Sequence, residues 1–255
     1  MGALPDVAEL ARLEQASAPA LIEWAMGEFG SSLAIATAFQ AEGMVIVDIA
    51  ARISPAVRVF TLDTGRLPEE TYKMIETVRE RYGVNVETVA PDTGEVEAMV
   101  GLHGPNLFYR EVPLRNLCCE VRKVRPLERK LRELKAWMVG LRRGQNESRA
   151  DVRKIEEIEG KLKLSPLADW SAADVSEYIR RHDVPMHPLY AAGYRSIGCA
   201  PCTRAVTAGE DERAGRWWWE LDTSDKECGI HFTPEGKAER KLDVLLGEVL
   251  EARRA

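Results

Sequence analysis

The sequence predicts an α/β fold in which helices flank a parallel β-sheet. Three short apolar runs have the length and composition of strands, at residues 32–39, 57–63 and 84–91. Between them lie two longer segments with helical periodicity, residues 43–53 and 68–83. Strand–helix–strand units of this length place successive strands in parallel and lay the helices over the sheet. The 255 residues, 45% of them hydrophobic, suffice for one large α/β domain or two small ones.

The second helix has recognisable start and stop signals. Pro68 lies near its first turn and Gly83 follows its last turn, the positions at which these two residues are favoured. Further along, "VPLRN" (112–116) predicts the start of a helix that contains Cys118 and Cys119 and continues to residue 134. "AWMVGLR" (136–142) then predicts a further strand.

The remaining chain is less regular. Residues 143–160 are polar and predict a loop with edge structure. In residues 169–183 we expect a helix whose N-cap is Ser171, with Asp174 completing a capping box. Because the periodicity fades after Cys202, we expect an α/β domain over residues 1–202 and a C-terminal segment over residues 203–255, a mobile tail with a final helix.

Charge and hydropathy limit the classes of partner. The net charge of −6 and the isoelectric point near 5.5 argue against a nucleic-acid partner. The first residues, "MGALPDVAELARLEQ", contain neither the basic nor the apolar region of a secretory signal. No apolar run approaches the ~18 residues that span a bilayer. We therefore expect a cytoplasmic protein without a membrane partner.

The five cysteines form an unusual set for a protein of a reducing compartment, where structural disulfides are rare. Cys118 and Cys119 are adjacent, and Cys199 and Cys202 form a C-x-x-C knuckle in "GCAPCTR". The fifth cysteine is Cys228. An odd total indicates four ligands and one reactive thiol, or five unrelated residues. With no histidine near either pair, the spacing leaves open an iron–sulfur cluster, a zinc ion or buried unliganded cysteines.

Several motifs together resemble a known family. "CCEVRKVRPL" (118–127), "CAPCT" (199–203), "TLDTGRLPEETY" (61–72), "GLRRGQNESR" (140–149) and "KECGIH" (226–231) are similar to the motifs of assimilatory adenylyl-sulfate (APS) reductases of the phosphoadenylyl-sulfate/adenylyl-sulfate reductase family. The resemblance extends over residues 30 to 235, with the motifs in the family's order.

The resemblance implies an adenine-nucleotide α-hydrolase-like (PP-loop) fold, with the nucleotide and cluster sites in residues 1–202. It also implies a [4Fe-4S] cluster on Cys118, Cys119, Cys199 and Cys202, and a nucleophile at Cys228 in the C-terminal segment. The expected reaction of sulfate assimilation reduces adenosine 5'-phosphosulfate to sulfite and AMP through a cysteine S-sulfonate. Thioredoxin or a similar dithiol is the expected donor.

Other functions are compatible with parts of the sequence. The 3'-phosphorylated nucleotide is the nearest alternative substrate, because the cluster signature does not reveal how a 3' pocket is closed. A PP-loop enzyme that thiolates tRNA would need an intact pyrophosphate loop and a basic face, and neither is evident. A non-enzymatic cluster redox sensor would leave Cys228 and "ECGIH" unexplained. A homo-oligomer is also compatible with the sequence.

Cations near the motifs are candidate substrate-binding residues. Lys123 lies four residues after Cys119, about one helical turn. Arg213 and Arg216 would share one face of a helix. The family resemblance adds the tail histidine, His231. A further group follows a predicted strand end, where α/β sheets bind ligands: Arg142, Arg143 and Arg149.

Two loops are candidates for the nucleotide. Related PP-loop enzymes have a Gly-rich turn after the first strand, whereas "TAFQAEGM" here has Gln40 and Gly43 where the reductases more often have Gly and Asp. The adenosine contacts expected around residues 37–43 therefore stay unassigned. "LDTGR" is the better ligand loop, with Asp63, Thr64, Gly65 and Arg66, although a β–α turn that needs Gly65 for its geometry would have the same sequence.

Overall fold

The computed structural model describes residues 5–145, 149–220 and 239–254. Its contacts divide the chain into two compact units. The first, here the sheet unit, comprises Met1–Thr61, Glu69–Thr88 and Leu131–Ala192. The second, here the cysteine unit, comprises Leu62–Pro68, Val89–Lys130 and Gly193–Ala255. The two units interleave along the sequence; the expected division after residue 202 stays a prediction.

A six-stranded sheet in the order β3-β2-β1-β4-β6-β5 organises the first unit. Its strands are β1 (Leu33–Ala36), β2 (Val59–Leu62), β3 (Val86–Val89), β4 (Ala136–Met138), β5 (Ile155–Ile158) and β6 (Lys161–Leu164). The central strand β1 pairs in parallel with β2 and β4, and β4 pairs in parallel with β6. Strand β5 pairs with β6 in the antiparallel direction. The predicted parallel sheet is confirmed, and β5 forms the expected edge structure in residues 143–160; β6 was not predicted.

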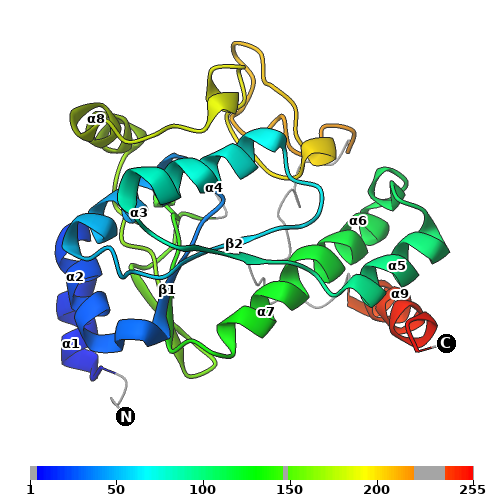
Figure 1. Ribbon diagram of the computed structural model, residues 1–255, viewed down its shortest axis with the longest axis horizontal. Coiled ribbons are helices and arrows are strands. Elements are labelled where there is room, and N and C mark those ends of the chain that lie inside the picture. Colours follow the sequence, from blue (N-terminus) through cyan, green and yellow to red (C-terminus); the bar gives the residue numbers. More distant parts are fainter. Residues whose placement is uncertain (1–4, 146–148, 221–238, 255) are drawn as a thin grey trace. The chain divides into compact units, whose positions relative to one another are not determined.

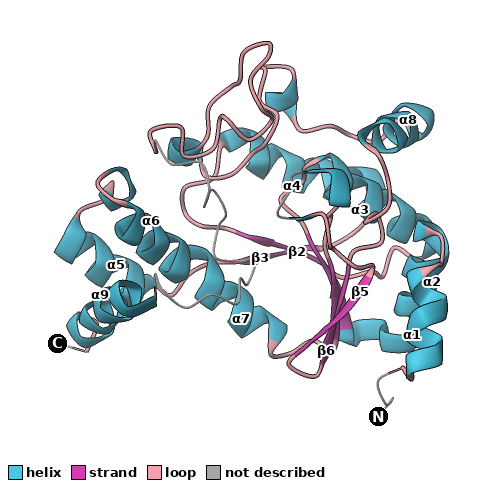
Figure 2. Ribbon diagram, turned by 180° about the vertical axis from the view of Figure 1, so that it is seen from behind, coloured by secondary structure: helices cyan, strands magenta, loops and turns pink. Residues whose placement is uncertain are grey.

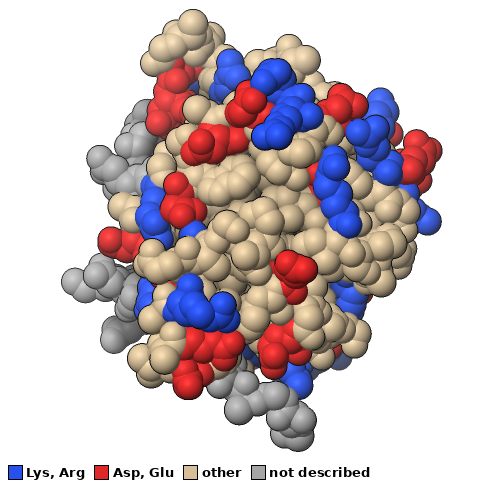
Figure 3. Space-filling model, turned by 90° about the vertical axis from the view of Figure 1, so that its left-hand side faces the viewer, with Lys and Arg blue, Asp and Glu red and all other residues tan. Residues whose placement is uncertain are grey.

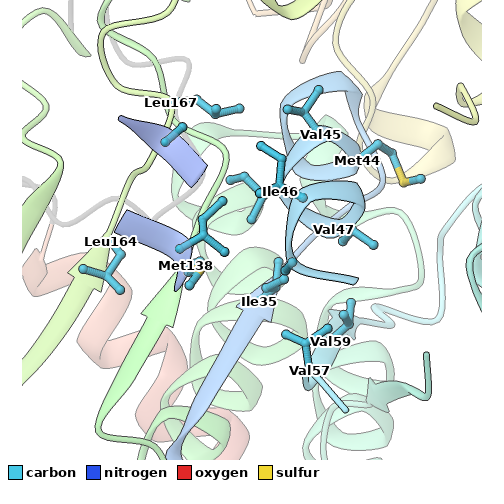
Figure 4. Close-up of a cluster of buried hydrophobic side chains, with 14 of the residues drawn as sticks. Ile35, Met44, Val45, Ile46, Val47, Val57, Val59, Met138, Leu164 and Leu167 are labelled. Carbon is cyan, nitrogen blue, oxygen red and sulfur yellow. The ribbon is translucent and has the colours of Figure 1, made fainter. Parts of the chain in front are cut away.

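The described part of the sheet unit contains the α-helices α1 (Val7–Glu14), α2 (Ala18–Phe29), α3 (Ala41–Ile53), α4 (Glu69–Tyr82) and α8 (Ala172–His182). Helix α3 packs against β1, α2 and α8. Its residues 43–50 are all buried, and Figure 4 shows Met44, Val45, Ile46 and Val47 among strand side chains such as Ile35 and Met138. The expected capping box of Ser171 and Asp174 begins α8. The predicted helices α3, α4 and α8 are therefore confirmed.

A buried carboxylate ties three of these helices together. Asp48 of α3 is fully buried and accepts hydrogen bonds from Tyr82 of α4 (3.1 Å) and Tyr178 of α8 (2.8 Å). Arg52, one turn further along α3, pairs with the same carboxylate at 2.7 Å. Burial and the Asp48 charge raise the pKa of both tyrosines, so both hydroxyls remain donors.

The cysteine unit is built from helices: α5 (Thr93–His103), α6 (Val112–Cys119), α7 (Arg125–Leu131) and α9 (Glu239–Ala252). A π-helical turn, Glu120–Val124, joins α6 to α7 in one continuous helical path. The helix predicted from residue 112 is therefore confirmed, but the π turn within it was not foreseen. Helix α9 packs on α5 and α6 (Figure 2) and confirms the expected final helix.

No described helix is long and apolar enough to cross a membrane. On the face shown in Figure 3, Lys and Arg side chains are interspersed with Asp and Glu. This mixture agrees with the modest net charge of the sequence.

Candidate active site

The four described cysteines line one pocket of the cysteine unit. Cys118 and Cys119 end α6, while Cys199 precedes a short 3₁₀ turn, Ala200–Cys202, that ends with Cys202. Three of these thiols are buried, and Cys118 is half-buried. The structure therefore brings together two cysteine pairs that lie about eighty residues apart in the sequence.

The π turn positions two cations beside these thiols. In this turn the Arg125 N–H donates to the Glu120 carbonyl. Such turns insert one residue into a helix and are frequent at functional sites. Arg122 and Lys123 lie within the turn, are both buried, and line the pocket.

Two more guanidinium groups line the pocket, those of Arg66 and Arg115. Arg66 donates to the Pro105 carbonyl (3.0 Å) and to the Asn106 side chain (2.8 Å). Arg115 forms a buried ion pair with Glu220 at 2.6 Å. With four cations and no carboxylate among its lining residues, the pocket favours an anion.

Burial dominates the acidity of the thiols. It raises the pKa of Cys118, although the nearby charges of Arg122 and Lys123 oppose the shift. Burial and the neighbouring Cys199 raise the pKa of Cys202 to about 12, again against Lys123. Burial therefore favours the protonated thiols of Cys118 and Cys202, whereas a bound metal centre would favour their thiolates.

The "LDTGR" loop directly contacts the second cysteine pair. The Thr64 hydroxyl lies 3.3 Å from Cys199 Sγ, and the Ala200 N–H donates to the Arg66 carbonyl at 2.8 Å. Gly65 has φ +67°, and a Cβ there would lie 3.3 Å from the Arg122 guanidinium. Its N–H donates to Asp63 at 2.8 Å. This loop is thus a tight turn that needs glycine and, at the same time, part of the pocket wall.

Neither Arg213 nor Arg216 lies on a helix: Arg213 is in a turn, and Arg216 forms an antiparallel β-bridge with Thr203. The Arg216 N–H donates to the Arg213 carbonyl at 2.8 Å, and Arg216 is buried against the Trp217 ring, 4.7 Å from its centroid. Arg213 is half-buried. Neither is among the described side chains that line the pocket, although Trp217 is.

Trp217 is buried between two guanidinium groups. Its other neighbour, Arg115, lies 4.6 Å from the ring centroid. The buried indole N–H has no hydrogen-bond partner among the residues that the structure describes. A buried N–H without such a partner, in the lining of the cysteine pocket, suits a hydrogen-bond acceptor on a bound group that is not part of the protein.

The other predicted cations belong to the sheet unit, where acidic and amide groups hold them. Arg142 pairs with Glu42 at 2.8 Å, and both side chains are nearly buried. Arg143 pairs with Glu14 at 3.2 Å. Arg149 donates to the Gln145 side chain at 2.5 Å. Their contacts with substrate stay predictions.

The β1–α3 loop (37–40), also in the sheet unit, leads to a helix N-terminus that a side chain of the same unit already contacts. The Ala41 N–H at the start of α3 donates to the Tyr190 hydroxyl at 3.1 Å. The Phe39 N–H donates to the Thr37 hydroxyl at 2.9 Å, and a Cβ on Gly43 would collide with that oxygen. Tyr190 thus occupies a helix N-terminus of the kind that binds phosphate in related loops, and no local sequence signal pointed to it.

Two predicted residues, Cys228 and His231, lie outside the described residues. Sequence reasoning missed Arg115 and Arg122 as pocket residues. A helical-phase signal exists for both, because Arg115 precedes Cys118 by three residues and Arg122 follows Cys119 by three.

The cysteine pocket offers four sulfur atoms as ligands for a metal centre. Among the described residues, no group of three or more His, Cys, Asp or Glu side chains forms a site for a single metal ion. Four sulfurs without imidazole or carboxylate are the ligand set of a [4Fe-4S] cluster, in which each cysteine binds a different iron and the sulfurs stand further apart. The lining residues fit such a cluster by chemical type.

Comparison with known proteins gives a consistent family. Residues 32–205 match the phosphoadenosine phosphosulfate reductase domain. An adenosine 5'-phosphosulfate reductase of Allochromatium vinosum is 49% identical over 78% of this chain and 78% of its own length. One from Burkholderia cepacia is 47% identical over 82% and 84%. The chloroplastic 5'-adenylylsulfate reductase 3 of Arabidopsis thaliana is 43% identical over 89% of this chain, which spans about half (51%) of that relative.

Solved structures agree with this assignment. The phosphoadenylyl-sulfate reductase of Candida auris, a phosphate complex, has a TM-score of 0.67 and 27% identity over 80% of this chain and all of that one. An FMN adenylyltransferase of Candida glabrata shares the fold alone, with a TM-score of 0.54 and 14% identity over 92% and 79%. The α/β fold expected from the sequence is thereby confirmed. From the matched domain and these relatives, the chain belongs to the phosphoadenosine phosphosulfate reductase family.

Proposed function

We propose that this chain reduces adenosine 5'-phosphosulfate to sulfite and AMP. It is an oxidoreductase of sulfate assimilation, as the names of its relatives in bacteria and plants indicate. The observation that carries the proposal is the pocket in which four cysteines converge beside Arg66, Arg115, Arg122 and Lys123. The unphosphorylated nucleotide is favoured because relatives at 47–49% identity carry its name, whereas the phosphoadenylyl-sulfate reductase is 27% identical.

A [4Fe-4S] cluster is the proposed resident of the pocket, held by Cys118, Cys119, Cys199 and Cys202. When bound, it would hold the four sulfurs as thiolates and bind the end of α6 to the C-x-x-C turn. The Thr64 hydroxyl, 3.3 Å from Cys199 Sγ, is placed to stabilise sulfur charge. The buried N–H of Trp217, a residue of the same pocket, is a further candidate donor.

The cations of the pocket supply the proposed anion site. A phosphosulfate carries several charged oxygens, and each charge-assisted hydrogen bond to it contributes about 1.5–3 kcal/mol. Lys123 and Arg122 are favoured for this role because both are buried and line the pocket. Arg213, Arg216, His231 and the three arginines of the sheet unit are retained as further candidates.

Cys228 is the proposed nucleophile. Its thiolate attacks the sulfur of the sulfonate, an S–S bond forms, and the bond from sulfur to the phosphate oxygen breaks with AMP as the leaving group. A thiolate of the donor then attacks Cys228 Sγ and releases sulfite. The second thiol of the donor closes its disulfide and frees Cys228, so the donor loses the two electrons that the sulfur gains. Thioredoxin, in the cytoplasm, is the proposed donor.

The function can be tested by measuring sulfite release from adenosine 5'-phosphosulfate and from its 3'-phosphorylated form, each with thioredoxin. We expect efficient release from the first nucleotide and an anaerobic protein that is brown, with about four irons per chain. Preference for the second nucleotide would correct the substrate alone. No sulfite from either would overturn the proposed function, and a colourless protein with one zinc per chain would overturn the cluster.

A further inference from the structure

The C-terminal helix α9 is packed firmly within the cysteine unit. Val249 is fully buried, and Leu242, Leu245 and Leu246 pack against the same apolar cluster as the cysteines. Figures 1 and 2 both show α9 beside α5. Helix α9 thus packs on α5, which also contacts the π turn.

Arg253, just after the end of α9, makes two polar contacts with the start of α5. It donates to Asp92 at 3.0 Å and to Glu95 at 3.1 Å. Asp92 is also the N-cap of α5 and accepts the Glu95 N–H at 3.0 Å. Gly94 allows this close approach, because a Cβ there would lie 3.2 Å from Arg253 Cγ.

Glu95 connects Arg253 to a second arginine. Its side chain is 5% exposed, and each carboxylate oxygen accepts a 2.8 Å hydrogen bond from Arg125. One of these oxygens also accepts from Arg253. A nearly buried carboxylate between two guanidinium groups is a well-defined junction, because both partners are needed to offset its desolvation.

Arg125 in turn closes the π turn. Its backbone N–H donates to the Glu120 carbonyl, and its side chain is fixed on Glu95. π turns are rare and occur mostly as single turns within α-helices, frequently at functional sites. The same turn holds Arg122 and Lys123 at the cysteine pocket.

Arg253 supplies one of the two guanidinium groups that contact Glu95, and Arg125 supplies the other. Loss of Arg253 would remove its contacts with both Asp92 and Glu95 at the start of α5.

We propose that Arg253 is a positioning residue for the cysteine pocket, which acts through Glu95 and Arg125 to hold the π turn that presents Arg122 and Lys123. The C-terminal helix is therefore part of the support of the site. The inference concerns the shape of the pocket, and only its kinetic consequence rests on the proposed function.

Hydrogen exchange of the full-length protein directly measures how firmly the π turn is held. Arg253→Glu should speed the exchange of amides 121–125 about tenfold, because it removes one ion pair and adds repulsion from Asp92 and Glu95. Arg253→Gln should give about threefold, and Arg253→Lys should restore most of the protection. The matched control is Arg58→Ala, since Arg58 also joins two acids, in the sheet unit. It should leave amides 121–125 unchanged.

The alternative is that Arg253 only fastens α9. In that case exchange would increase in α9 and at the start of α5 in both the Glu and Gln variants, with amides 121–125 as protected as in the wild type. That result would overturn the proposal. If Arg253→Glu detaches α9 altogether, the Gln variant decides in the same way.

A kinetic measurement separates this inference from the proposed function. With adenosine 5'-phosphosulfate as substrate, Arg253→Gln should lower kcat/KM severalfold, and Arg253→Lys should recover most of it. A wild-type protein without activity would refute the proposed function and leave the exchange result to decide the role of Arg253. An active protein whose Gln variant exchanges faster at 121–125 but keeps the wild-type kcat/KM would contradict the positioning role in catalysis.

Discussion

The ion pair between Arg115 and Glu220 offers a sharp test of how the cysteine pocket is supported. The two side chains are 2% and 9% exposed, with a 2.6 Å contact. Arg115 also lines the pocket and lies over Trp217. Glu220→Ala removes the carboxylate and, with it, the 2.6 Å charged contact of the buried Arg115 guanidinium. Breaking a buried pair in this way costs about 3–5 kcal/mol.

A matched control is available on the surface. Glu177 pairs with Arg180 at 2.6 Å, but the side chains are 59% and 75% exposed. Exposed pairs contribute about 0–1 kcal/mol, so Glu177→Ala should scarcely change the free energy of unfolding. The comparison separates the effect of burial from that of losing an ion pair.

Urea unfolding, followed by tryptophan fluorescence and by hydrogen exchange of α6, measures the effect. Exchange is needed because a protein of two units need not unfold in one step. We expect Glu220→Ala to weaken the protection of α6 by at least a hundredfold, as about 3 kcal/mol implies. Protection of α6 equal to that in Glu177→Ala would refute the view that this pair holds the pocket wall.

Three further changes test separate parts of the structure. Lys123→Met should lower kcat/KM about ten- to a hundredfold, because it removes a charged donor. The control Lys163→Met, on β6, should leave kcat/KM unchanged. Equal kcat/KM values for the two variants in steady-state kinetics would exclude Lys123 from the anion site. Gly43→Ala should cost about 1–3 kcal/mol, because its Cβ collides with the Thr37 hydroxyl, and a thermal melt should show recovery when Thr37→Ala is added. Glu120→Gln should raise stability at neutral pH, because burial and Glu128 raise the pKa of Glu120 above its ordinary 4.5. The folded state then binds the proton more tightly than the unfolded state, so the wild type loses stability as pH rises through that window, and the advantage of the Gln variant should vanish below about pH 4.5. A constant difference across pH would contradict this explanation.

Much of the fold follows from local patterns in the sequence. The apolar run that forms β1 has the length of a strand, whereas the fully buried stretch of α3 belongs to a segment with the length of a helix. Ser171 and Asp174 specify the start of α8 through side-chain chemistry alone. In contrast, β6 has only four residues, two of them lysines, and its pairing with β4 depends on tertiary contacts.

The site shows the same division. The apolar periodicity predicts the helix that carries Cys118 and Cys119. It does not predict the π turn, because the inserted residue leaves the composition of the segment unchanged. The tertiary structure brings Cys118 and the distant Cys199 to the same pocket, and the sequence could indicate this proximity only through family resemblance. The ion pair of Arg143 with Glu14, on a helix far away in the sequence, is likewise a tertiary contact that no local pattern indicates.

The central claim is that this chain transfers a sulfonate to its own cysteine, and a single-turnover measurement tests it most directly. Protein mixed with adenosine 5'-phosphosulfate, without thioredoxin, should release about one AMP per chain and then stop. Mass spectrometry should locate one added sulfonate on the peptide that contains Cys228, and thioredoxin should remove it as sulfite. Cys228→Ser should form no adduct, because a hydroxyl is a far weaker nucleophile than a thiolate at neutral pH. Near wild-type turnover of the serine variant, or a sulfonate on Cys199 or Cys202, would contradict the mechanism.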